Sequence, residues 1–128
     1  MPLGKASKAQ LLTCHPDLIR LVVDVVAQID AGALAYAGIR DVSVLCGHRT
    51  EAEQNACFNA KPPTSKLPWP KSKHNSLPSR AVDMVPYPVD WKDGNHEHVL
   101  RGFVLARAWA LGIKIRVISW DLPHYELV

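Results

Sequence analysis

The chain carries three candidate metal ligands that lie far apart in its sequence, and a metal site needs a fold that brings them together. His74 and Asp83 are nine positions apart, and His124 follows about forty residues later. Imidazole nitrogen and carboxylate oxygen are good zinc ligands, and a catalytic zinc site uses three protein ligands with one position left open. Asp121, three residues before His124, is a carboxylate that need not be a ligand and can serve as a base. These residues predict a site built from two distant segments.

From residue type and spacing alone, metal-free alternatives stay open for these residues. Asp121 can cap a turn, and the histidines can be half-buried and hydrogen-bonded. His96-Glu97-His98 resembles a metal motif, but two histidines only two positions apart face different sides of a helix, so we expect a solvated first helical turn there. Glu126 is interpreted as a partner of a ligand histidine rather than as a ligand.

The three cysteines are odd in number and have no CxxC spacing, so we expect free thiols, with a zinc–cysteine site as the minor alternative. The four tryptophans are expected mostly in the core, except Trp120, which we place in a pocket wall because it precedes Asp121. The cysteines are Cys14, Cys46 and Cys57, and the other tryptophans are Trp69, Trp91 and Trp109.

The composition fits one folded domain over residues 1–128. Hydrophobic residues make up 48 % and charged residues 21 %, which is ordinary for a globular chain, and the net charge is +3. No Lys/Arg run or aromatic–basic pattern indicates nucleic-acid binding. No apolar run approaches the roughly 18 residues of a membrane span, and the N-terminus lacks the features of a signal peptide. We therefore expect a monomer without membrane insertion that stays in the cytoplasm until it is released.

Hydrophobic periodicity predicts an α+β domain with a small, mostly antiparallel sheet and helices packed on one side of it. Pro16 begins a helix that His15 caps, and Thr50 with Glu53 has the spacing of a capping box. Residues 61–70 contain four prolines and predict a loop. The expected helices span residues 16–29, 51–60 and 95–111, and the expected strands span 42–45, 80–85, 113–117 and 124–127.

Several motifs, in order, resemble the zinc-binding signature of the M15 peptidases. They are Ser72-Lys73-His74-Asn75, Ala81-Val82-Asp83 and the run from Trp120 to Glu126, preceded by Gly47-His48-Arg49-Thr50. The likeness covers about residues 14 to 126. It departs from the family in the interval between His74 and Asp83, which is longer than usual and has no glycine.

The resemblance implies a role for each matching residue. His74, Asp83 and His124 would hold one zinc ion, and Asp121 would be the catalytic base. Arg49 would bind or polarise the substrate, and Ser72 would lie at the pocket edge. We also place His48, beside Arg49, and Trp120 in contact with the substrate; a cap of the turn is the alternative for His48.

The resemblance implies a zinc peptidase that acts on peptidoglycan stem peptides. We expect an endolysin that hydrolyses the L-alanyl-D-glutamate bond during host lysis and waits in the host cytoplasm until it reaches the periplasm and cell wall. The alternatives are a D-alanyl-D-alanine carboxypeptidase or dipeptidase, and a non-catalytic zinc-containing wall-binding domain. The carboxylate of Asp121 is the feature against the last of these, because a structural zinc site has no use for a base.

Overall fold

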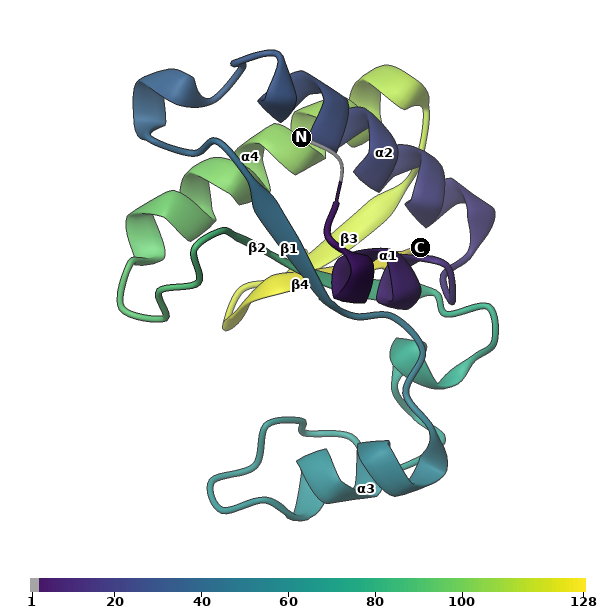
Figure 1. The fold of residues 1–128 in the computed structure, drawn as a ribbon. Coiled ribbons are helices and arrows are strands. Elements are labelled where there is room, and N and C mark those ends of the chain that lie inside the picture. Colours follow the sequence, from purple (N-terminus) through teal and green to yellow (C-terminus); the bar gives the residue numbers. More distant parts are fainter. Residues whose placement is uncertain (1–2) are drawn as a thin grey trace.

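Four antiparallel strands form one sheet in the order β1-β2-β4-β3 (Figure 1) in a computed structural model that describes residues 3–128. The fold is α+β, as predicted. No helix within these residues is long and apolar enough to cross a membrane. The strands are β1 (Val42–Cys46), β2 (Ala81–Pro86), β3 (Ile115–Ile118) and β4 (Asp121–Leu127); the helices are α1 (Lys5–Leu11), α2 (Pro16–Asp30), α3 (Glu51–Asn59) and α4 (Gly94–Leu111), with short 3-10 turns η1 (Ala35–Ala37) and η2 (Lys73–Asn75).

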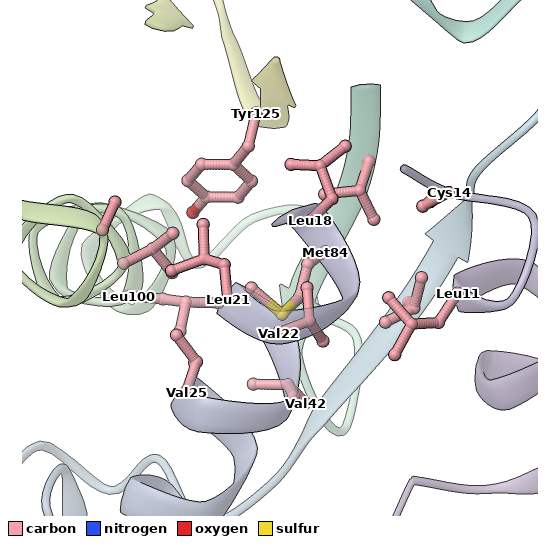
Figure 2. Close-up of a cluster of buried hydrophobic side chains, with 14 of the residues drawn as sticks. Leu11, Cys14, Leu18, Leu21, Val22, Val25, Val42, Met84, Leu100 and Tyr125 are labelled. Atoms are coloured by element: carbon pink, nitrogen blue, oxygen red, sulfur yellow. The ribbon is translucent and has the colours of Figure 1, made fainter. Parts of the chain in front are cut away.

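Helices α2 and α4 cover one face of the sheet, and the core lies between them and the strands (Figure 1). Helix α2 begins at Pro16 with His15 as its cap, as the sequence predicts, because the imidazole accepts the Asp17 amide. Figure 2 shows Tyr125 of β4 and Met84 of β2 pointing into the same cluster as the apolar face of α2. Successive strand residues point to opposite faces. The neighbours of these core residues therefore point to the other side of the sheet.

Helix α1, which the sequence analysis missed, covers the outer edge of β1. Three polar side chains at intervals of three accept backbone N–H groups from this edge and the residues after it. An edge strand with unpaired N–H groups is a template for unwanted strand pairing, and a covering helix removes that hazard. The bonds are Val44 N–H to Ser7 Oγ (3.0 Å), Gly47 N–H to Gln10 Oε1 (3.1 Å) and His48 N–H to Thr13 Oγ1 (2.8 Å).

Gly47 is the point of closest approach between this helix and the end of β1. A Cβ atom there would collide with the Gln10 carbonyl oxygen and with the Thr13 side chain. We expect Gly47→Ala to lower the free energy of unfolding by about 1–3 kcal/mol, because the backbone of α1 would have to move. Gly102→Ala is the matched control: Gly102 lies within α4 with open space around it, so alanine should stabilise by about 0.5–1 kcal/mol. Urea denaturation measures both, and equal effects would contradict the predicted contact.

Helix α3 and the loop after it lie beyond the face of the sheet that α2 and α4 leave uncovered (Figure 1). The predicted capping box is present, since the Thr50 hydroxyl accepts the Glu53 amide and the Glu53 carboxylate accepts the Thr50 amide. Gln54 is fully buried and fixes the loop, because its amide donates to Ser65 Oγ and to the Leu67 carbonyl. The loop over residues 61–70 contains no helix or strand, as predicted.

The prediction that the tryptophans lie mostly in the core is wrong, because none of Trp69, Trp91 and Trp109 belongs to it, although Trp69 is half-buried. Trp91 is 64 % and Trp109 is 88 % exposed. Aliphatic side chains and Tyr125 fill the core instead.

Candidate metal centre

Strand pairing brings two of the predicted ligands together on the sheet face opposite the core. Asp83 of β2 is directly paired with His124 of β4, and paired residues point to the same side. Their chain neighbours Val82 and Tyr125 belong to the core on the other side. His74 reaches the same point from η2, where the Ser72 hydroxyl caps the turn by accepting the His74 amide N–H.

Three potential ligand atoms form a nearly equilateral triangle. His74 Nε2 lies 3.1 Å from Asp83 Oδ1 and 3.2 Å from His124 Nδ1, and His124 Nδ1 lies 3.2 Å from Asp83 Oδ1. In a tetrahedral zinc site with ligand bonds of 2.0–2.1 Å, two ligand atoms are about 3.3 Å apart. The spacing and the donor types therefore fit Zn²⁺. The unusual interval between His74 and Asp83 still delivers the aspartate to the histidine.

The outer nitrogen of each histidine is already bound to an acceptor. His74 Nδ1 lies 2.7 Å from the Gly47 carbonyl oxygen, and His124 Nε2 lies 2.8 Å from Glu126 Oε1. These nitrogens therefore carry the protons, and in the neutral rings the inner nitrogens present lone pairs. Two lone pairs and a carboxylate oxygen then converge on one point, where a bound cation can satisfy all three groups at once. The predicted role of Glu126 as a partner of a ligand histidine agrees with this geometry.

Without a metal, the pKa values of His74 and Asp83 favour protonated histidine beside ionised aspartate. Burial lowers the pKa of His74, but Asp83 and Cys46 outweigh it and raise that pKa to about 10. Burial raises the pKa of Asp83, but hydrogen bonds from His124 and His74 hold it well below its ordinary value. Protons thus supply the positive charge when no metal does, and metal binding would displace them.

Cys46, for which a free thiol was the main expectation and a zinc–cysteine site the minor alternative, lies beside this cluster because of a bulge in β1. Val44 pairs with Met84 and Cys46 pairs with Asp83, so Leu45 is an extra residue on β1. Such a bulge re-aims the side chains that follow it. The ligand atoms of Cys46, His74 and Asp83 all lie within 4.8 Å of one another, which makes these residues a possible metal site as well.

Asp121, the predicted base, begins β4 at the edge of the cluster. Its Oδ2 lies 4.0 Å from His124 Nδ1, outside the close triangle. Burial, with repulsion from Asp83, raises the pKa of Asp121, which brings it nearer to the range where a general base is effective. The buried guanidinium of Arg101 in α4 donates to the backbone carbonyls of Asp121 and Leu122 and so fixes the start of this strand. The sequence analysis did not identify Arg101.

Arg49 lies between the metal cluster and α3. Its Nη2 is 3.5 Å from Asp83 Oδ2, and its Nη1 donates to Gln54 Oε1 at 2.9 Å. The Arg49 amide also donates to the His74 carbonyl at 2.8 Å, and Asn75 bonds to the Arg49 carbonyl and to Gln54. Gln54 thereby ties the arginine, the ligand-bearing turn and the proline-rich loop to one buried amide.

Two adjoining cavities open on either side of the cluster. One of about 430 Å³ is lined by His74, His124, Ser72 and the proline-rich loop; the other, of about 480 Å³, extends toward α4. Arg49, Asp83, Trp120 and Asp121 line both, so the two form one trough that passes the candidate ligands.

Of His48 and Trp120, both predicted to contact the substrate, Trp120 lines this trough and His48 does not. Trp120 is 55 % exposed and carries the Lys66 ammonium 4.4 Å from its ring centroid, so the loop flanks the cleft. Among the described residues, His48 does not line either cavity, and its Nδ1 lies 3.0 Å from the Ser76 carbonyl oxygen. This position resembles the turn-capping alternative more than a substrate contact.

Glu97 is a further residue of the trough that the sequence analysis placed in solvent. It is only 9 % exposed and lines the second cavity together with Trp91. Burial raises the pKa of Glu97. The expectation of a solvated first turn in α4 is therefore wrong for this residue, because the turn packs toward the start of β4.

Comparison with known proteins agrees with the fold and identifies the family. Residues 1–126 match a family described as phage L-alanyl-D-glutamate peptidase. Among solved structures, the crystal structure of the Serratia marcescens L-Ala D-Glu endopeptidase ChiX is similar, with a TM-score of 0.66 and 24 % sequence identity over 100 % of this chain and 90 % of that one. A search of curated proteins found no match.

Proposed function

Because the chain belongs to the phage L-alanyl-D-glutamate peptidase family, we propose that it is a zinc-dependent endopeptidase that hydrolyses the L-alanyl-D-glutamate bond of peptidoglycan stem peptides. The observation that carries the zinc part is the convergence of His74 Nε2, His124 Nδ1 and Asp83 Oδ1 at 3.1–3.2 Å, with both outer imidazole nitrogens held as donors. We assign these three residues as the ligands.

In this proposal, each residue around the cluster has a separate role in hydrolysis. A zinc ion held by His74, Asp83 and His124 would supply Lewis acidity to the scissile carbonyl and to the attacking water. Asp121 accepts the proton of that water and passes it to the leaving amine, a use that its raised pKa favours. Arg49, which lines both cavities, donates to the oxygen that becomes negative as the carbonyl carbon turns tetrahedral.

The open trough supports an endopeptidase over an exopeptidase. A carboxypeptidase needs a pocket that is closed just beyond the terminal residue, so that the free carboxylate is held at its end. The two cavities here lie on both sides of Asp83 and Asp121, so a peptide can extend past the site in both directions. We further propose that the protein acts in host lysis and is held in the host cytoplasm until it reaches the wall.

Digestion of purified peptidoglycan sacculi tests this function directly. We expect fragments with new amino-terminal D-glutamate by mass spectrometry, lost when a chelator is present and restored by added zinc. Release of terminal D-alanine alone would move the protein to the carboxypeptidases. No product from protein that holds one zinc ion would favour the non-catalytic wall-binding domain.

A further inference from the structure

Three lysines on one side of the metal cluster have no acidic partner. Lys66, Lys71 and Lys73 line the 430 Å³ cavity, and within residues 3–128 none of them forms an ion pair. The two arginines of the same cavity are engaged, Arg49 with Asp83 and Arg116 with Glu126. The lysines are therefore the charges of this cavity that remain free for a ligand.

The other arm of the trough has the opposite character. Glu97 and the aromatic ring of Trp91 line it, and among the described residues no lysine does. The metal cluster thus lies between a basic arm and an acidic, partly aromatic arm. A substrate with negative charge on only one side of its scissile bond would bind in one direction, because like charges repel in the wrong one.

The L-alanyl-D-glutamate bond has this asymmetry. On the leaving side, D-glutamate has two carboxyl groups, and when one of them forms the next amide bond the other remains a carboxylate close to the leaving nitrogen. On the other side, L-alanine contributes only a methyl group. Lys73 directly precedes the candidate ligand His74, so their Cα atoms are about 3.8 Å apart and a lysine side chain can reach such a carboxylate.

We propose that Lys71 and Lys73, with Lys66 at the rim of the cavity, bind the free carboxylate of the D-glutamate residue, and that the L-alanine side lies in the arm of Glu97 and Trp91. The inference rests on the proposed function and names the feature of the substrate that sets its direction and specificity. Lys66 is already held over Trp120, which keeps its charge at the junction of the two arms.

A pair of substrates that differ only in this charge tests the proposal. One is a stem peptide with the free D-glutamate carboxylate, and the other has a carboxamide in its place. We expect the zinc-loaded wild-type chain to show a kcat/KM at least about tenfold higher for the carboxylate peptide. The preference should shrink as salt is added, since Lys66 and Lys71 are exposed and Lys73 is only half-buried.

Variants of Lys71 and Lys73 test whether these lysines cause the preference for the carboxylate peptide. In Lys71→Gln/Lys73→Gln the ratio of the two kcat/KM values should fall toward one, and in Lys71→Arg/Lys73→Arg it should persist. Lys61→Gln, an exposed position in the proline-rich loop outside both cavities, is the control that should keep the wild-type ratio. Zinc content and circular dichroism verify that each variant is folded and loaded.

Two results would overturn the inference while leaving the peptidase in place: equal cleavage of both peptides by the wild type, or an unchanged preference in the double glutamine variant. Failure of the zinc-loaded wild type to cleave either peptide would instead overturn the proposed function, and the inference with it.

Discussion

Asp121→Asn should reduce kcat on a stem peptide by about 10²–10⁴-fold while the protein still binds one zinc ion per chain. The asparagine keeps the size of the side chain but cannot accept the proton of the attacking water. Asp121 Oδ2 lies 4.0 Å from His124 Nδ1, outside the triangle of candidate ligands, so its loss should leave the metal in place. Peptide cleavage and elemental analysis of the same preparation measure both quantities.

Asp17→Asn is the matched control for this experiment. Asp17 is exposed in the first turn of α2 and lines neither cavity of the trough, so its replacement should change neither rate nor zinc content. If Asp121→Asn lost the zinc together with the activity, Asp121 would be a ligand and another group would have to be the base.

His124→Ala should abolish both zinc binding and peptide cleavage. It removes one of three converging ligand atoms, and it leaves Asp83 and His74 with a gap at the sheet face. Glu126→Gln should have a smaller effect than His124→Ala. It keeps the His124 ligand but weakens the acceptor that fixes the His124 ring, so zinc affinity should fall by about 10–100-fold. Competition with a chromophoric chelator measures the affinity of each.

Cys46→Ser distinguishes the two possible ligand sets. If the metal lies among His74, Asp83 and His124, the serine variant should bind zinc while His124→Ala should not. If instead His124→Ala kept wild-type affinity and Cys46→Ser lost it, the metal would lie at the cluster of Cys46, His74 and Asp83.

Much of the fold follows from local sequence patterns. The apolar face of α2, the cap at Thr50 and the alternation in β3 are each visible over a few residues, and the structure confirms each. Helix α1 was missed for a physical reason. Ser7 and Gln10 of this helix, and Thr13 just after it, accept backbone N–H groups at the edge of the sheet, so the segment shows no strong apolar period. The edge that it covers is not visible in the sequence.

In the candidate site too, some residues could be identified from local sequence and others depend on tertiary contacts. His74, Asp83, His124 and Asp121 were found because their chemistry and order are distinctive. A metal role for Cys46 was only the minor alternative, since the bulge at Leu45 that turns it toward Asp83 depends on strand register. Glu97 was placed in solvent because its burial depends on how the first turn of α4 packs against the start of β4.

Helix α1, which covers the edge of β1, is linked to the metal site although it contributes no ligand to it. The helix holds Gly47 through Gln10, and the Gly47 carbonyl decides which nitrogen of His74 carries a proton. Docking of the helix and binding of the metal are therefore linked equilibria. The free energy by which a docked helix strengthens metal binding equals the free energy by which bound metal stabilises the docked helix. Metal loading should make α1 harder to open, and any change that loosens α1 should weaken the affinity for zinc.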